Sequence, residues 1–305
     1  MDLRHIRYFV AVAEEGHLTR AAERLGIEQP SLSRLIKNVE QDLDVKLFRR
    51  RPRGVELTDA GRAFLDKARA ILTSVDEAVV MVKRTARGEQ GQVTVGWAHT
   101  APYHPFVLPV IRAYRETFPL VSLTIEETGS DVLIQHIRDE RIDVAFVRSL
   151  PADSSGLLIS RLAEENLVVA LPSGHSLALD KGKRDTALPV NALANEPFIL
   201  GRHFKLALHA ATIAACHAAG FAPRVAQEIP RTTSTLAYVA AGAGVAFVPA
   251  SMQRIQMRGV SFRRVSSPIQ LTLRLDLASR RGDPSPVVRQ FVSLVTRAAK
   301  DFSEE

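Results

Sequence analysis

The sequence is poor in cysteine and aromatic residues: it has one cysteine, and aromatic side chains make up 6% of its 305 residues. A lone Cys216 cannot form a disulfide within the chain, which is typical of a protein from a reducing compartment. Long apolar runs are also missing, since no stretch approaches the roughly 20 residues that a membrane span needs. The start, MDLRHIRYFVAVAEEGH, is too charged for a signal peptide. We therefore expect a cytoplasmic protein with no membrane contact.

Motifs that mark common enzymes are likewise missing. The sequence has no phosphate-binding loop, no G-x-G-x-x-G after a strand, no H-E-x-x-H and no G-x-S-x-G. We therefore expect no enzyme activity. His209, Cys216 and His217 are spaced to share a helix face, but a closed metal site needs about four ligands with tight spacing. We expect neither a metal nor a cofactor.

The charge balance is basic, with 40 Lys and Arg against 33 Asp and Glu and a formal net charge of +7. Such a balance favours polyanionic partners. The stretch 45–54, VKLFRRRPRG, holds five cations and no acid. A run of charges is often only a solvated surface. This one follows closely on a helical hairpin, which makes a binding role more plausible.

That hairpin is the stretch 18–43, LTRAAERLGIEQPSLSRLIKNVEQDL, which predicts two short helices joined by a tight turn. Gly26 suits the left-handed conformation that ends the first helix, and a first turn tolerates Pro30 in the second. The apolar face of the second helix is Leu32, Leu35, Ile36, Val39 and Leu43. Its other face carries hydrogen-bonding groups and cations: Gln29, Ser31, Arg34, Lys37, Asn38 and Gln41. Such a helix suits a DNA major groove, although an ordinary helical hairpin has the same pattern.

The residues around the hairpin complete a small domain. We expect a first helix over residues 1–16 and a two-stranded ribbon over 45–57, with Pro52-Arg53-Gly54 at its tip. Three helices followed by a basic ribbon form a winged helix-turn-helix, which we assign to residues 1–58. The ribbon would present three cations to phosphates or to an adjacent minor groove: Arg50, Arg51 and Arg53.

A single long helix is expected over residues 59–87, begun by the capping residue Thr58. Its apolar residues follow a heptad seam: Phe64, Ala68, Ile71, Val75, Ala78 and Val82. A long helix with such a seam needs a partner, and we expect dimerisation rather than packing on its own domain. Residues 88–92, which contain two glycines, are expected to form a hinge.

Beyond residue 92, alternating strands and helices predict a parallel sheet covered by helices. The order occurs twice, so we expect a two-lobed α/β domain over residues 93–305. Lobe I comprises 93–161 and 269–305, and lobe II comprises 162–268. Because lobe I is made of two separate segments, the chain would cross between the lobes twice, which is typical of a hinged ligand-binding domain. A transport protein would also use one, but that hypothesis leaves the basic N-terminal module unexplained.

Taken in order, these motifs resemble LysR-type transcriptional regulators over the whole chain. The matching stretches are FVAVAEEGHLTRAAERLGIEQPSLSRLIKNVEQDLDVKLFRR, GVELTDAGRAFL, ERIDVAFVR and VAAGAGVAFVPAS. The resemblance implies an all-α-type winged helix-turn-helix domain, a linker helix and a two-lobed α/β effector domain similar to periplasmic binding proteins. It also implies a ligand-responsive homodimer or homotetramer that binds double-stranded promoter DNA and acts on RNA polymerase. The lobes most resemble the branch that controls aromatic and chloroaromatic catabolism in response to muconate-type acids.

By this resemblance, the helix that begins near Pro30 is the recognition helix, and Arg53 matches the wing-tip position that enters the minor groove. The residues implied to lie near bases and phosphates are Gln29, Pro30, Ser31, Ser33 and Arg34. Lys37, on the outward face of the same helix, is a further candidate for DNA binding.

The effector cleft should lie outside the carboxyl ends of the parallel strands. Helix starts there favour an anion, and arginine can bind a carboxylate through two hydrogen bonds. The candidate effector-binding residues are Thr100, Ser130, Arg148, Arg202, His203, Phe204 and Thr232. They predict that the effector is a small organic acid. As alternatives, Thr100, Ser130 and Thr232 would be plain helix caps, and the two arginines would form ion pairs between the lobes or be solvated. Residues 201–204 depart from the pattern of muconate-responsive members, which is richer in Ser and Pro.

Overall fold

The structure is a computed structural model that describes residues 1–52, 54–179, 186–201, 207–229 and 232–304. The chain divides into two compact units, Met1–Arg84 and Thr85–Glu305. In the described part of the chain, no helix is both long enough and apolar enough to cross a membrane.

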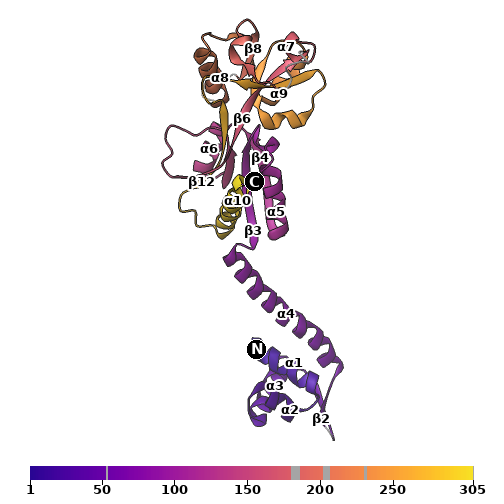
Figure 1. Ribbon diagram of the computed structural model, residues 1–305. Coiled ribbons are helices and arrows are strands. Elements are labelled where there is room, and N and C mark those ends of the chain that lie inside the picture. The colour runs from indigo at the N-terminus through magenta and orange to yellow at the C-terminus, as the bar shows by residue number, and fades with distance from the viewer. Residues whose placement is uncertain (53, 180–185, 202–206, 230–231, 305) are drawn as a thin grey trace. The chain divides into compact units, whose positions relative to one another are not determined.

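The N-terminal unit contains short helices, a two-stranded ribbon and most of a long helix (Figure 1). Its elements are α1 (Leu3–Glu15), α2 (Leu18–Leu25), α3 (Gln29–Asp42), β1 (Phe48–Arg51), β2 (Gly54–Leu57) and α4 (Asp59–Arg87). These confirm the predicted helices and ribbon. Gly26 ends α2 at a φ of 67°, a left-handed conformation that costs glycine little.

One core joins the helices, the ribbon and α4. The Phe9 ring of α1 lies with its centroid 5.2 Å from that of Phe48 in β1 and 4.8 Å from that of Phe64 in α4. Leu32 of α3 is fully buried in the same cluster. Leu43 was predicted on the buried face, but it is 37% exposed. The helix ends at Asp42 and Leu43 is its C-cap residue, so the helical periodicity stops there.

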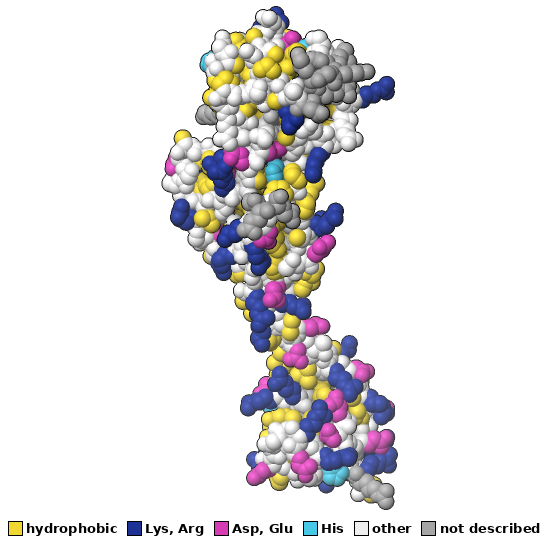
Figure 2. All heavy atoms as spheres, in the orientation of Figure 1, with side chains coloured by type: hydrophobic (Ala, Val, Ile, Leu, Met, Phe, Trp, Pro, Cys, Tyr) yellow, Lys and Arg dark blue, Asp and Glu magenta, His cyan; other side chains and the backbone are white. Residues whose placement is uncertain are grey.

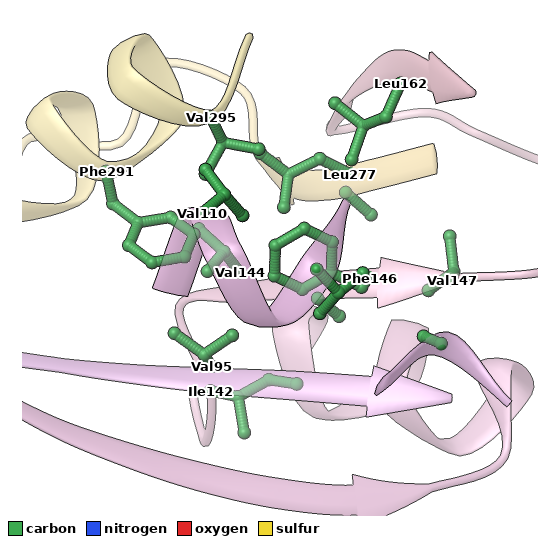
Figure 3. Close-up of a cluster of buried hydrophobic side chains, with 14 of the residues drawn as sticks. Val95, Val110, Ile142, Val144, Phe146, Val147, Leu162, Leu277, Phe291 and Val295 are labelled. Atoms are coloured by element: carbon green, nitrogen blue, oxygen red, sulfur yellow. The ribbon is translucent and has the colours of Figure 1, made fainter. Parts of the chain in front are cut away.

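Lobe I of the C-terminal unit is built on parallel strands, with β3 paired to both β4 and β5. Its elements are β3 (Gln90–Ala98), η1 (Ala101–Tyr103), α5 (Val107–Thr117), β4 (Leu120–Thr128), α6 (Ser130–Arg138), β5 (Val144–Val147) and α10 (Pro286–Glu304). Figure 3 shows Phe146 of β5 in the core with Val110 of α5 and Phe291 of α10. The last helix therefore returns to lobe I, as predicted.

The remaining elements belong to lobe II, except that β6 and β12 are shared with lobe I. In chain order they are β6 (Leu157–Pro172), α7 (Ser176–Leu179), β7 (Leu188–Pro189), η3 (Val190–Leu193), β8 (Pro197–Gly201), α8 (Ala207–Ala218), β9 (Arg224–Ile229), α9 (Thr232–Ala240), β10 (Ala246–Pro249), η4 (Ala250–Ile255), β11 (Val260–Ser266) and β12 (Thr272–Arg280). β8 and β9 pair in parallel, as predicted.

The main sheet is mixed rather than parallel throughout. Its strands run in the order β4-β3-β5-β12-β6-β11-β7, and β10 also pairs with β6. β12 is antiparallel to both β5 and β6. The chain crosses between the lobes in β6 and again in β12. β6 begins at Leu157 and continues past the predicted lobe boundary at residue 161 as far as Pro172.

The two hydrophobic cores meet within these crossover strands. Leu162 and Leu275 pack in the core of lobe I, whereas Leu167 and Leu273 pack in that of lobe II. The cores therefore divide a few residues after the predicted positions 161 and 268, because each strand is long enough to pass from one core into the other.

The predicted hinge at 88–92 is largely strand. β3 begins at Gln90, where it pairs with Leu120 of β4. Only Gly88 and Glu89 lie between α4 and β3. Pairing with β4 thus extends regular structure over glycine-rich residues that the sequence pattern assigns to a connection.

Candidate functional sites: a helix-turn-helix surface and an inter-lobe cleft

The outer face of α3 presents the side chains that the sequence predicts. Pro30, Arg34 and Lys37 are exposed, while Gln29, Ser31 and Ser33 are partly buried. Among the described residues, no carboxylate pairs with Arg34 or Lys37. On the face drawn in Figure 2, Lys and Arg side chains are interspersed with Asp and Glu over the Met1–Arg84 unit.

The ribbon divides its arginines between two faces, because successive side chains of a strand point in opposite directions. Arg49 and Arg51 share Glu56: Arg49 Nη2 lies 2.9 Å from Glu56 Oε1 and Arg51 Nε lies 2.8 Å from Oε2. Hydrogen bonds from the two guanidinium groups lower the pKa of Glu56 to about 2. Arg50 lines a groove with Ser33 and Lys37 of α3. Of the predicted wing arginines, Arg50 thus lines the groove beside α3, whereas Arg51 forms an ion pair with Glu56.

Glu40, the buried acid of α3, was not among the site residues predicted from the sequence. Its Oε1 accepts hydrogen bonds from the backbone N–H groups of Leu47, at 2.9 Å, and Phe48, at 3.1 Å. Its Oε2 lies 2.8 Å from Lys46 Nζ. Glu40 thereby ties the ribbon to α3. A single acid in a helix has no periodic signal, so only the fold reveals this role.

Thr100, Ser130 and Arg148, three of the predicted effector residues, lie together in a cleft between the lobes. The inter-lobe cleft is lined by Ala98, His99, Thr100, Thr128, Gly129, Ser130, Asp131, Val132, Arg148, Ser149, Ala207, Leu208 and Leu273. Its volume is about 190 Å³. Sites for drug-sized ligands are typically about 300–1,000 Å³, so this volume favours a small ligand.

Arg148 is the buried cation of the cleft and is 6% exposed. Its backbone N–H donates to Ser130 Oγ at 3.1 Å, and its Nη2 donates to the carbonyl oxygen of Thr100 at 3.3 Å. The same Nη2 lies 2.6 Å from Glu165 Oε1. The buried atoms Nε and Nη1 have no hydrogen-bond partner among the described residues. Burial lowers the pKa of Arg148, although nearby Glu165 opposes that shift.

Glu165 connects Arg148 to lobe II. It lies on β6 and accepts hydrogen bonds from Ser251, at 2.8 Å from the backbone N–H and 3.1 Å from the hydroxyl. Ser251 belongs to η4, so the chain of contacts runs from lobe I through a crossover strand into lobe II. Neither residue was among the site residues predicted from the sequence. An ion pair between the lobes was one of the alternative roles considered for Arg148, and it is present.

The other predicted effector residues are not placed in the cleft. Arg202, His203 and Phe204 lie outside the described residues, as does Arg53 of the wing. Thr232 begins α9, and its side chain is also outside what is described.

The residues considered for a metal site have other surroundings. His209 Nδ1 lies 3.1 Å from the carbonyl oxygen of Gly201, and burial raises the pKa of Cys216 to about 11. Within the described ranges, no group of three or more His, Cys, Asp or Glu residues is placed to hold a metal ion.

Comparisons with known proteins match both parts of the chain. Residues 3–62 match the family model "Bacterial regulatory helix-turn-helix protein, lysR family", and residues 86–300 match "LysR substrate binding domain". The chain is 34% identical over 295 residues to the transcriptional regulator AlsR of Bacillus subtilis, covering 96% of this chain and 95% of AlsR. It is 34% identical over 296 residues to the transcriptional regulator BudR of Raoultella terrigena, covering 96% of this chain and 100% of BudR.

Among solved structures, full-length CbnR in complex with its target DNA is similar with a TM-score of 0.84 at 31% identity. The similarity covers 98% of this chain and 100% of that one. These relatives differ little in identity, so they do not single out the aromatic branch that the motifs suggested.

Proposed function

The chain belongs to the LysR family of DNA-binding transcriptional regulators, and we propose that a small carboxylate in its inter-lobe cleft controls its binding to promoter DNA. It has the helix-turn-helix and effector-binding domains of that family, and the relatives it matches are named as regulators rather than enzymes. The observation that carries the carboxylate proposal is the buried guanidinium of Arg148.

Burying a cation is unfavourable unless its hydrogen bonds are satisfied. Glu165 and the Thr100 carbonyl engage Nη2 of Arg148, but Nε and Nη1 have no described partner. A buried donor left unpaired costs about 1–3 kcal/mol. The oxygens of a carboxylate ligand would accept from these donors. Ser130, whose hydroxyl oxygen already accepts from Arg148, keeps its own O–H to donate to the same ligand.

The recognition surface is proposed to read DNA as the family resemblance implies. Gln29, Pro30, Ser31, Ser33, Arg34 and Lys37 would face the major groove, and Arg50, Arg51 and Arg53 would serve the wing. Exposed cations without a described acidic partner, as at Arg34 and Lys37, support this assignment. Their charge is available to DNA without first breaking an ion pair.

Oligomerisation and location complete the proposal. Ile71 and Val82 of the α4 seam are 41% and 63% exposed. A second copy of α4 would cover them, giving a homodimer or, through further contacts, a homotetramer.

We propose that the protein acts on promoter DNA in the cytoplasm, where it would meet RNA polymerase. Acids related to aromatic catabolism, such as benzoate, belong in the ligand screen.

Two measurements test this function. Electrophoretic mobility shifts with genomic promoter fragments should reveal sequence-specific binding, which Arg34→Ala should weaken by about 1–3 kcal/mol if it reads a base edge. Thermal unfolding with small carboxylates should show stabilisation that Arg148→Ala removes while DNA binding persists. Binding to no promoter fragment would contradict the DNA role, and stabilisation that survives Arg148→Ala would contradict the ligand site.

A further inference from the structure

Asp131 is the only carboxylate among the described residues that line the inter-lobe cleft. It is the second residue of α6, directly after Ser130, whose hydroxyl oxygen accepts from the backbone N–H of Arg148. Asp131 and Arg148 both line the cleft, so the acid of α6 and the buried cation border the same cavity. The cleft therefore presents both signs of charge to a ligand.

The Asp131 carboxylate is oriented over the start of its helix. A methyl group placed on Gly129 would come within 2.7 Å of Asp131 Oδ1. Gly129 also lines the cleft, and it has no side chain to separate this carboxylate from a ligand. Asp131 forms no hydrogen bond or ion pair with any described residue. Its oxygens are free to accept from a ligand.

The charges of the described residues around the cleft oppose a doubly negative ligand. Arg148 already faces Glu165, at 2.6 Å, so much of its positive charge is compensated before a ligand arrives. Asp131 then adds a second carboxylate. Among the described lining residues, the other titratable side chain is His99, which lies 3.2 Å from Glu127. One anionic group can use the Arg148 donors, but a second would meet Asp131, and like charges at close range repel.

We infer that Asp131 makes the cleft selective for a small monocarboxylate that also carries a hydrogen-bond donor, a hydroxyl or ammonium group, and selective against dicarboxylates. The inference rests on the proposed carboxylate site. The ligand carboxylate accepts from Arg148 and Ser130, and its donor group faces Asp131. Asp131 is thus a specificity-determining residue, and muconate-type diacids are poor ligands.

The test uses two matched series with the full-length protein, read by calorimetric titration and thermal unfolding. The first is propionate, lactate, alanine and succinate, and the second is benzoate, salicylate and cis,cis-muconate. Lactate or alanine should bind at least tenfold more tightly than propionate and succinate, or salicylate at least tenfold more tightly than benzoate and muconate. A bound donor satisfies Asp131, whereas an apolar or anionic group does not.

Substitutions at Asp131 give the sharper test. Asp131→Asn keeps an acceptor oxygen but removes the charge, so it should bind the diacids at least tenfold more tightly and lose any preference for an ammonium group. Asp131→Ala should also lose the preference for a hydroxyl group. Asp139→Asn makes the same charge change just after the end of α6, outside the cleft lining, and should leave the ranking unchanged.

The outcomes separate this inference from the proposed function. Carboxylates that bind in an Arg148-dependent manner but keep their ranking in Asp131→Asn would overturn the inference alone. Diacids that bind the unmodified protein as tightly as the monoacids with a donor would do the same. Failure of every carboxylate to bind would overturn both the carboxylate site and its selectivity.

Discussion

The buried carboxylate of Glu40 on α3 accepts a hydrogen bond of 2.9 Å from the backbone N–H of Leu47, the residue before the first strand of the wing. Because the next residue, Phe48, donates to the same oxygen, one side chain fixes the position of the wing relative to α3. Burial alone raises the pKa of Glu40, but hydrogen bonds from Lys46, Phe48 and Leu47 outweigh burial and lower it.

Glu40→Gln should lower the free energy of unfolding of the N-terminal unit by about 2 kcal/mol, since hydrogen bonds to a charged group are each worth about 1.5–3 kcal/mol. Folding lowers the pKa of Glu40, so its contribution is complete above the unfolded value of about 4.3 and is lost as pH falls through the folded value. Urea unfolding of the full-length protein against pH measures both effects. Lys46→Met, which removes a 74% exposed partner, should cost less than about 1 kcal/mol. Equal losses in the two variants would contradict the role of the backbone contacts.

Gly61→Ala should destabilise the N-terminal unit by about 1–3 kcal/mol, although alanine normally stabilises a helix by about 1 kcal/mol over glycine. A Cβ on Gly61 would lie 2.1 Å from the carbonyl oxygen of Leu47, so α4 and the wing would have to move apart. Thermal unfolding measures the change. Ser74→Ala, at an exposed position of the same helix, serves as the control and should be neutral or slightly stabilising. A stabilised Gly61→Ala would show that the contact with Leu47 is not tight.

Stability should fall on mild acidification because of His104. Burial lowers the pKa of this side chain to about 4, and the nearby charges of Glu165, Arg148 and Arg254 modify that shift. The unfolded chain takes up a proton below about pH 6.5, whereas the folded protein does so only near pH 4. Stability is therefore lost as pH falls from about 6.5 to 4.

His104→Asn should flatten this loss, because asparagine keeps an acceptor for the Phe106 N–H but does not titrate. Urea midpoints measured between pH 7 and pH 4 give the comparison. A variant whose pH profile matches that of the unmodified protein would assign the loss to other groups.

Charged substitutions in the α4 seam should dissociate the proposed dimer. Val82→Glu introduces a charge at a seam position that is 63% exposed in the single chain, and it should raise the dissociation constant at least tenfold. Light scattering during size-exclusion chromatography gives the mass at each concentration. Thr73→Glu, exposed and off the seam, is the matched control. An unchanged mass for Val82→Glu would place the interface elsewhere.

Arg50 and Arg51 of the wing should differ in their contribution to DNA affinity. Arg50 faces the groove with Lys37, whereas Arg51 shares Glu56 with Arg49. Arg50→Ala should reduce the slope of log affinity against log salt by about one unit if it neutralises a phosphate. Arg51→Ala should reduce it less, because Glu56 already offsets its charge. Equal reductions would show that DNA displaces Glu56.

Local periodicity was sufficient to predict the helix-turn-helix, the ribbon, α4 and the α/β alternation. The bounds of α4 match the predicted residues 59–87. The meeting of Thr100, Ser130 and Arg148 was also predictable, since the carboxyl ends of neighbouring parallel strands lie at one edge of a sheet. These features depend on residues close in sequence or on a general rule of strand order.

What periodicity could not supply was the set of partners that decide how each charge behaves. Ser251 and Glu165 are 86 residues apart, and only Ser251 lies in one of the family motifs, yet together they hold Arg148 between the lobes. Glu40 looks like one acid among many until the turn after α3 brings the wing backbone to it. Contact between residues far apart in sequence depends on strand pairing and core packing, which no short pattern encodes. The residue types could therefore be read from the chain, but their pairing, burial and remaining free donors required the tertiary structure.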